Sequence, residues 1–283
     1  MIAAHLVLVG ASILTNAQRA GIVEGSLPDL EAGLKGGRVD EGELTGRLVE
    51  FVSGDPKGAS AELSTLLDLL EEWYERGLQQ WVYLLFSDTR IGRVCAETLR
   101  NYLMNVSGER YGGRVAVEMV RVEGLGDPER FEDGLARLFS TITEIIRARK
   151  GEGDRVFVHA TGGFKPETAM AILAANSPGT GAPVFYVHEH FKRVVRIPAM
   201  PVKFRKWGKL TELIGSLVDI GPAARDALEG RYGKDAVRQA VRLGWAEEKE
   251  ERVYPTETAK VLWRQTEEVW RQKKQESKKP DAS

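Results

Sequence analysis

The stretch Arg155 to Asn176 reads RVFVHATGGFKPETAMAILAAN, and its pattern predicts how the rest of the chain is organised. Val156 to Val158 is a short apolar run of β-forming residues that Thr161-Gly162-Gly163 interrupts, which is typical of a buried strand ending in a tight turn. Pro166 and the apolar spacing after it predict a helix. Because the residue before a proline avoids the α region, we expect Lys165 to be extended at the helix cap and to point away from the helix.

This position of Lys165 is unusual. A lysine beside the positive end of a helix dipole is unfavourable unless an anion neutralises both charges. Two glycines just before it would let the backbone approach such a ligand closely. Two interpretations stay open: a phosphate cradle made of glycine backbone, helix N-terminus and one ammonium, or a common strand-to-helix turn that carries a solvated lysine.

Strands and helices alternate on both sides of this stretch. We expect strands at His5–Val9, Trp81–Phe86, Arg114–Val122, Pro183–Val187 and Arg193–Ile197, of which the last two can pair as a hairpin. Helical periodicity covers residues 43–52, 59–76, 90–104 and 128–149. The alternation predicts an α/β fold with a Rossmann-like, mostly parallel sheet.

Polar loops follow the first two strands, at Gly10-Ala11-Ser12 and at Ser87 to Arg90. Right-handed crossovers would place both loops at the same sheet edge as the turn after His159, where open α/β folds bind ligands. Ser12 is therefore either a ligand contact or a helix N-cap. Arg90 either reaches a phosphate or is solvated, with Ser87 or Asp88 capping the helix that follows.

The pattern changes after residue 200 from alternating strands and helices to short helices alone. Helices at 210–218, 222–228 and 234–243, a possible β-wing at 246–254 and a last helix at 256–270 predict a winged helix-turn-helix domain. We place the first domain at residues 1–200, the winged helix at 201–270 and a disordered charged tail at 271–283. Lys234, Arg238 and Arg242 make the candidate recognition helix only moderately basic.

Net charge and residue composition bear on the class of function and on the cellular compartment. A net charge of −1 over 283 residues argues against coating nucleic acid by bulk charge. The single cysteine, Cys95, fits a reducing compartment, and the absence of a long apolar run or a signal peptide favours the cytoplasm. His188 and His190 share one face of an expected strand, but no cysteine or carboxylate cluster accompanies them, so we expect neither a metal nor a cofactor.

Three stretches together resemble a known family: VGASILTNA at Val9–Ala17, GASAELSTL at Gly58–Leu66 and ATGGFKPETA at Ala160–Ala169. They are similar to the CRISPR-associated Rossmann-fold (CARF) sensor domain, and specifically to the ring nucleases of type III CRISPR systems. The likeness covers roughly residues 1 to 200. It implies a homodimer whose two-fold axis passes through a cyclic oligoadenylate, most often cyclic tetra-adenylate. Members with a C-terminal winged helix and no separate nuclease domain have a similar layout.

The resemblance implies that Ser12 and Lys165 are the catalytic pair, since they occupy the matching motif positions. The implied ligand contacts are Gly10, Ala11, Thr161, Gly162, Gly163 and Phe164. Thr89 and Arg90 join them on the topology argument alone. Ala11 stands where the family pattern leads us to expect a threonine, which leaves Ser12 as the only hydroxyl donor of its loop.

Cleavage of an RNA phosphodiester needs no enzyme nucleophile, because the neighbouring ribose 2′-hydroxyl can attack. The sequence has no paired carboxylates or histidine cluster of the kind that two-metal phosphodiesterases use, which agrees with a metal-independent route. The resemblance thus implies a ring nuclease that switches off antiviral signalling, and this chemistry predicts that it converts cyclic tetra-adenylate into linear di-adenylates with 2′,3′-cyclic phosphate ends.

Two other functions are alternatives to a ring nuclease. The first is a transcription regulator, in which the sensor domain binds the same ligand without catalysis and the winged helix binds DNA. Five acidic residues of the winged helix argue against DNA binding: Glu229, Glu247, Glu248, Glu250 and Glu251. The second is an ordinary nucleotide-binding Rossmann enzyme. It is disfavoured because no G-x-G-x-x-G follows the first strand and no G-x-x-x-x-G-K-[ST] occurs anywhere.

Overall fold

The computed structural model describes residues 1–177, 179–188, 193–197, 208–261, 263–264 and 266–267. The chain divides into two compact units, Met1–Met200 and Pro201–Ser283, which are described separately. The predicted disordered tail at 271–283, the residue His190 and the side chain of His188 lie outside the described residues.

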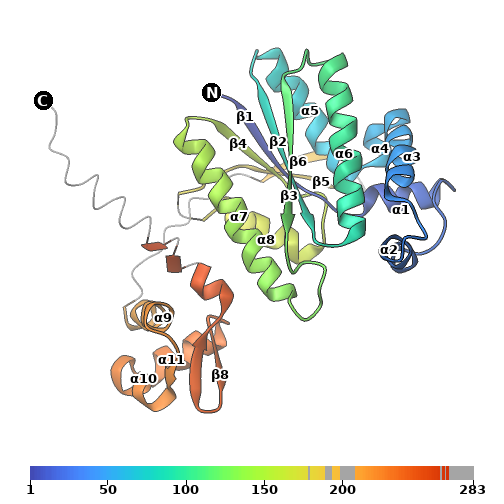
Figure 1. The fold of residues 1–283 in the computed structure, drawn as a ribbon. Coiled ribbons are helices and arrows are strands. Elements are labelled where there is room, and N and C mark those ends of the chain that lie inside the picture. The colour runs from blue at the N-terminus through green and yellow to red at the C-terminus, as the bar shows by residue number, and fades with distance from the viewer. Residues whose placement is uncertain (178, 189–192, 198–207, 262, 265, 268–283) are drawn as a thin grey trace, which may run out of the picture. The chain divides into compact units, whose positions relative to one another are not determined.

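A six-stranded sheet with the order β3-β2-β1-β4-β5-β6 forms the centre of the first unit (Figure 1). The first five strands run parallel, and β6 pairs antiparallel with β5. The predicted Rossmann-like sheet and the predicted hairpin between its last two strands are therefore confirmed. The strands are β1 (Ala3–Leu8), β2 (Gln80–Ser87), β3 (Val115–Val122), β4 (Arg155–His159), β5 (Val184–His188) and β6 (Arg193–Ile197).

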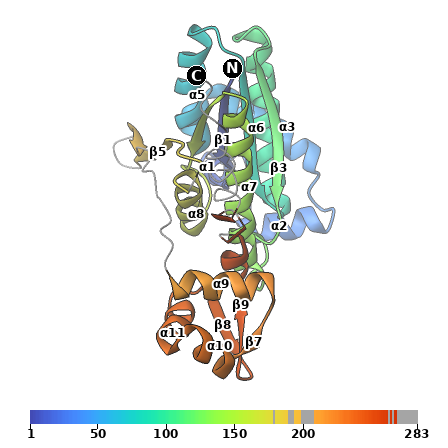
Figure 2. The same ribbon diagram turned by 90° about the vertical axis from the view of Figure 1, so that its left-hand side faces the viewer.

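Helices cover both faces of this sheet, which explains why every residue of β1 is buried (Figures 1 and 2). One face packs against α5 (Ala61–Glu75) and α6 (Arg90–Glu109). Four more helices pack on these two and share their apolar core: α1 (Ser12–Arg19), α2 (Leu27–Lys35), α3 (Glu41–Gly54) and α4 (Pro56–Ala59). The other packs against α7 (Phe131–Gly151) and α8 (Lys165–Ala175). Within the described part of the chain, no helix has both the length and the apolar character needed to cross a membrane.

The strand order fixes where a ligand site can form. The chain builds outward from β1 through β2 to β3 and then returns to place β4 on the other side of β1. Loops that leave β1 and β4 therefore lead to helices on opposite faces of the sheet, which is the point at which open α/β folds bind ligands. The Gly10 loop and the Thr161–Pro166 turn lie at this point.

Residues 17–57 contain more helix than their sequence pattern predicts. The helix α2 begins with a capping box, in which Asp29 N–H donates to Ser26 Oγ (3.3 Å) and Ser26 N–H donates to Asp29 Oδ2 (3.2 Å). The predicted helix at 59–76 corresponds to α5, which begins only at Ala61 because Ser60 is extended and its hydroxyl caps α5 by accepting from Leu63 N–H (3.2 Å).

The second unit consists of α9 (Lys209–Asp219), β7 (Ala223–Ala224), α10 (Arg225–Tyr232), α11 (Lys234–Arg242), β8 (Ala246–Lys249) and β9 (Arg252–Pro255). Its strands form an antiparallel sheet of order β7-β9-β8. The turn between β8 and β9 places Glu250 (φ 50°) and Glu251 (φ 63°) in the left-handed region, which side chains other than glycine adopt at a cost.

A histidine pair is buried in the centre of the sheet. His5 Nε2 lies 3.2 Å from Gln80 Oε1, and His5 Nδ1 lies 3.1 Å from His159 Nε2. Since Gln80 Oε1 can only accept, His5 carries its proton on Nε2 and accepts from His159 Nε2–H, so each ring is neutral. Burial lowers the pKa of His5 to about 4 and holds the pKa of His159 well below its ordinary value.

We predict that the free energy of unfolding falls as the pH is lowered from about 6.5 to about 4. An unfolded histidine titrates near 6.5, so between that pH and about 4 the unfolded chain binds more protons than the folded chain. The loss from His5 alone should reach about 3 kcal/mol. Urea unfolding at about pH 7 and about pH 4.5 measures it, with the His5→Gln, His159→Gln double variant as control. An identical pH dependence in that double variant would contradict the assignment.

Candidate functional site

A cavity of about 520 Å³ opens at the carboxyl ends of the parallel strands and is called here the strand-end cavity. Its lining comes from the loops after β1 to β4, from α1 and α2, and from the starts of α6 and α8: Val9, Gly10, Ala11, Ser12, Thr15, Leu27, Pro28, Glu31, Ser87, Thr89, Ile91, Gly92, Leu125, Gly126, Gly163, Phe164 and Glu167. The structure thus brings loops that are far apart in the sequence to one edge of the sheet.

Six of the ten predicted site residues line this cavity: Gly10, Ala11, Ser12, Thr89, Gly163 and Phe164. The other four, Lys165, Arg90, Thr161 and Gly162, are not part of its lining. Gly162 is buried beneath the turn. Thr161 Oγ1 accepts a hydrogen bond from Val187 N–H at the end of β5 (3.2 Å), which ties the turn to the neighbouring strand.

Consecutive glycines allow the protein's own groups to approach the turn closely. A Cβ on Gly10 would stand 2.5 Å from Gly163 N, so the loops after β1 and β4 touch through their backbones. A Cβ on Gly162 would collide with the Leu8 carbonyl and with the Glu62 carboxylate. Gly163 has a φ of +82° and faces the carboxylate of Glu167. Loop-to-loop packing therefore explains the glycines without a bound anion.

Glu62, at the start of α5, is a buried carboxylate that the sequence pattern did not single out. It is 1% exposed, and each hydrogen bond that reaches it is donated to it. Gly10 N–H donates to Oε1 (2.8 Å), whereas the hydroxyls of Ser12 (2.5 Å) and Ser60 (2.8 Å) donate to Oε2. Ser12 is the first residue of α1 and not its N-cap, so its hydroxyl proton serves Glu62 and not its own helix.

Glu167 is the second carboxylate at the turn. It is 6% exposed, lines the cavity and accepts a hydrogen bond from Phe164 N–H (2.9 Å). Burial raises the pKa of Glu167, and the Phe164 N–H opposes part of that shift. Because Glu167 reaches back to Phe164, Phe164 is the extended N-cap of α8 and Lys165 is its first helical residue. The prediction that Lys165 is the extended cap was therefore wrong by one residue.

Lys165 remains an exposed cation at the start of a helix. Within the part of the chain that the structure describes, its ammonium makes no ion pair. Lys165 directly follows Phe164, which lines the cavity, so its charge is available to a ligand that reaches the start of α8.

The loop after β2 is held by its own side chains. Thr89 is the N-cap of α6, with Oγ1 accepting from Gly92 N–H (2.9 Å), so the predicted cap at Ser87 or Asp88 was wrong. Asp88 instead accepts from Gly124 N–H (2.9 Å) and Gly126 N–H (2.7 Å), which fixes the loop after β3. Arg90 pairs with Glu41 of α3 at 2.8 Å, so its guanidinium is neither free in solvent nor directed into the cavity.

Glu31 of α2 occupies the N-terminus of α6. Its carboxylate accepts from Ile91 N–H (2.8 Å) and Arg90 N–H (3.1 Å), which are donors that an external anion would otherwise use. Burial favours a higher pKa for Glu31, but these two N–H groups and Lys35 hold it below its usual value. This wall of the cavity was not predicted from the sequence pattern, although the Ser26-x-x-Asp29 capping box marks the start of α2.

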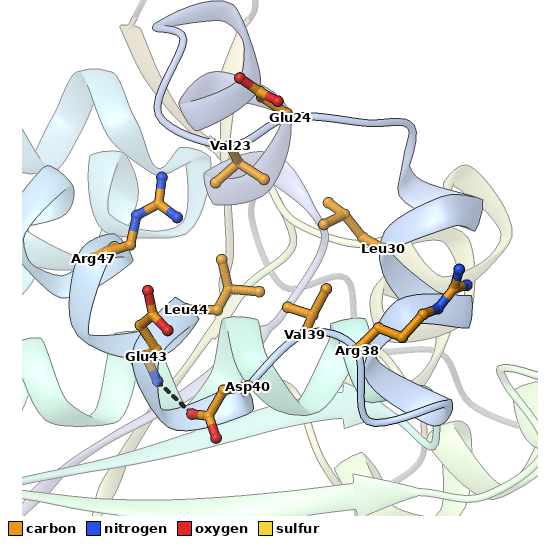
Figure 3. A pocket seen from close by; sticks show the side chains of 9 residues that line it. All are labelled: Val23, Glu24, Leu30, Arg38, Val39, Asp40, Glu43, Leu44 and Arg47. Carbon is orange, nitrogen blue, oxygen red and sulfur yellow. Dashed lines mark hydrogen bonds between the residues drawn. The ribbon is translucent and has the colours of Figure 1, made fainter.

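A second, smaller hollow of about 260 Å³ lies between α2 and α3 (Figure 3). Val23, Leu30 and Leu44 give it an apolar floor, and the side chains of Arg38 and Arg47 stand on opposite sides of it. None of the predicted site residues lines it.

We predict that Gly162→Ala destabilises the fold by about 1–3 kcal/mol, because the new methyl group would overlap the Leu8 carbonyl and Glu62. Gly46→Ala is the matched control. Gly46 lies inside α3 with open space around it, so this change should stabilise the protein by about 0.5–1 kcal/mol. Urea unfolding measures each variant, and a Gly162→Ala protein as stable as wild type would refute the packing described above.

A family model described as CRISPR-associated protein (Cas_APE2256) matches residues 57–200, which is just over half of the chain. The chain belongs to this family. The matched range holds Glu62, Glu167 and the whole double-glycine turn, whereas the Ser12 loop precedes it.

Two solved structures show weaker likeness to this member of the family. Protein VC1899 from Vibrio cholerae is 10% identical with a TM-score of 0.35, over 98% of this chain and 69% of that chain. Can2 from Sulfobacillus thermosulfidooxidans, solved in complex with cyclic tetra-adenylate (cA4), is 13% identical with a TM-score of 0.30, over 78% of this chain and 67% of that chain.

Proposed function

We propose that the protein binds a cyclic oligoadenylate over the strand-end cavity and cleaves it, without a metal, into linear di-adenylates with 2′,3′-cyclic phosphate ends. The observation that best supports this proposal is the contact between the loops after β1 and β4, which brings Ser12 and the double-glycine turn to one cavity. Membership of a CRISPR-associated family and the likeness of three sequence stretches to ring nucleases support the same function. The reaction would switch off type III CRISPR signalling.

The described residues offer the two things that the reaction needs. Attack by a ribose 2′-hydroxyl requires that hydroxyl to be held in line with the scissile phosphate, and the cavity wall with Ser12 supplies a polar contact for it. Charge that grows on the phosphate oxygens requires a cation or N–H donors. Lys165 is the exposed cation of the turn, and it stands at the positive end of the α8 dipole.

Phe164 supports recognition of a nucleobase. Its side chain is 71% exposed although it borders the cavity, which is unusual for a phenylalanine unless a partner covers it. An aromatic ring at the rim can stack on any base, and adenine offers a large flat face. We assign Phe164 to base stacking, with Thr161 and Gly162 as the supports of the turn that carries it.

We further propose that the protein acts as a homodimer with cyclic tetra-adenylate on its two-fold axis. A cavity of about 520 Å³ has the size that encloses a drug-like ligand, and a ring of four nucleotides is larger. One copy would therefore cover part of the ring, and a second copy would present the same residues to the remainder. Leu173 of α8, which is 59% exposed, is available for such a contact.

Radiolabelled cyclic tetra-adenylate incubated with the protein in EDTA tests the proposal. We predict slow conversion to di-adenylate by the wild type and a loss of about 100-fold or more in Lys165→Ala, because the phosphate charge loses its cation. Lys209→Ala is the matched control, since Lys209 is also exposed at the first position of a helix, α9, in the other unit. It should cleave at the wild-type rate.

Two different results would contradict the proposal, one for its function and one for its site. An intact ring after long incubation with excess wild-type protein rejects the function. Wild-type cleavage by the Lys165→Ala variant rejects the site but leaves the function standing.

A second function is favoured by one observation. Lys234, Arg238 and Arg242 are exposed at intervals of four along α11, while Ala236 and Val237 are buried on its other side. We propose that the second unit is the winged helix expected from the sequence, and this basic face would suit a DNA groove. The acidic turn at Glu250 and Glu251 opposes it. DNA binding whose affinity falls steeply with salt would support a transcription regulator, and no binding at low salt would exclude it.

A further inference from the structure

The Ser12 hydroxyl already uses most of its hydrogen-bonding capacity within the protein. A serine hydroxyl has one proton to donate and two lone pairs that accept. The Ser12 proton is donated to Glu62 Oε2 (2.5 Å), and one lone pair accepts from Ala61 N–H (3.1 Å). One lone pair therefore remains for the strand-end cavity, which Ser12 lines. In this arrangement Ser12 can accept a hydrogen bond from a ligand but cannot donate one.

This limits which part of a cyclic oligoadenylate can meet Ser12. Non-bridging phosphate oxygens are acceptors only, so they find no donor at the Ser12 hydroxyl. The ribose 2′-hydroxyl is a donor, and it is also the group that must lose its proton in the cleavage. The hydrogen-bond pattern thus selects the attacking hydroxyl, and not the phosphate, as the partner of Ser12.

Glu62 lies directly behind Ser12 and outside the cavity. Three donors reach its two oxygens, so both oxygens act as hydrogen-bond acceptors. Its position is fixed, because Gly162 and the Leu8 carbonyl close around it. The ordered path that results runs from the cavity to Ser12 Oγ and from there to Glu62 Oε2.

We propose that Glu62 is the terminal proton acceptor of the cleavage reaction and receives, through Ser12, the proton of the attacking 2′-hydroxyl. This inference rests on the proposed ring-nuclease function. As the bond from O2′ to phosphorus forms, the O2′ proton passes to Ser12 Oγ while the Ser12 proton passes to Glu62 Oε2. The bond from phosphorus to O5′ breaks, and the leaving O5′ takes a proton from water. Glu62 later returns its proton to solvent by the same path.

Glu62 is a positioning residue in this scheme because it acts through Ser12 and does not touch the ligand. Removing its charge should therefore slow cleavage without weakening binding. Glu62→Gln keeps the shape and can still accept from Gly10 N–H, but its amide would donate to Ser12 and reverse the direction of that hydrogen bond. Glu72→Gln is the matched control, since Glu72 lies on the same helix, is exposed and pairs only with Arg76 (2.7 Å) among the described residues.

The experiment measures the dissociation constant of cyclic tetra-adenylate and the single-turnover cleavage rate for each variant. We expect Glu62→Gln to bind as wild type does and to cleave about 100-fold more slowly or worse, the usual contribution of a general base. Ser12→Ala and the double variant Ser12→Ala, Glu62→Gln should lose the same factor as Glu62→Gln, because groups that act as one unit are not additive. Glu72→Gln should match the wild type in binding and in rate.

The possible results separate the inference from the function on which it rests. If the wild type cleaves and Glu62→Gln cleaves equally fast, only the relay is overturned. The relay is also overturned if Glu62→Gln loses affinity and rate together, because that marks a role in the shape of the cavity, or if the two substitutions multiply in the double variant. A wild-type protein that leaves the ring intact removes the function and the relay together.

Discussion

The buried carboxylate of Glu62 is the constraint around which this end of the sheet is built. An ionised group almost wholly removed from water is costly unless its oxygens receive hydrogen bonds. Here the donors come from Gly10, Ser12 and Ser60, which belong to the loop after β1 and to the start of α5. Satisfying one carboxylate therefore joins two segments that are about fifty residues apart, and it leaves room beside Glu62 only for a glycine at position 162.

The same end of the sheet contains more acidic groups than an anion site normally holds. Glu31 fills the N-terminus of α6, and Glu167 stands at the start of α8, where a phosphate would otherwise be favoured. Arg90 is already paired with Glu41. A polyanionic ligand would thus meet few positive charges inside one copy of the protein. In the proposed function this charge is met by Lys165, which is exposed at the start of α8, and the proposed two-fold partner would supply a second copy of that cation.

Much of this arrangement could be predicted from the sequence. Apolar runs such as Trp81–Phe86 mark the buried strands, and the handedness of parallel connections places Ser12 and the double-glycine turn on one edge. Glu62 could not be identified in the same way, since its partners lie at Gly10 and Ser12 and long-range hydrogen bonds leave no periodic signal. The packing role of the glycines was not predicted for the same reason: the protein atoms that fill the space beside them come from distant parts of the sequence.

The local errors have equally physical origins. Proline rules predicted an extended Lys165, but the Glu167 carboxylate moved the cap to Phe164 by accepting its N–H. Two side chains of the loop after β2 could cap α6: Thr89 does so, whereas Asp88 accepts a hydrogen bond from the loop after β3. The wall that α2 contributes was missed because glycines and charges hide its short apolar face, although its capping box is visible in the sequence.

A crystal structure of Lys165→Ala bound to intact cyclic tetra-adenylate tests the central claim most directly, because this variant retains Ser12 and Glu62 while losing the cation. The account predicts a ribose 2′-hydroxyl within hydrogen-bonding distance of Ser12 Oγ, at about 2.8 Å, with the neighbouring phosphate near the vacated position of the lysine. A ring bound elsewhere, or bound with a phosphate oxygen against Ser12, would contradict it.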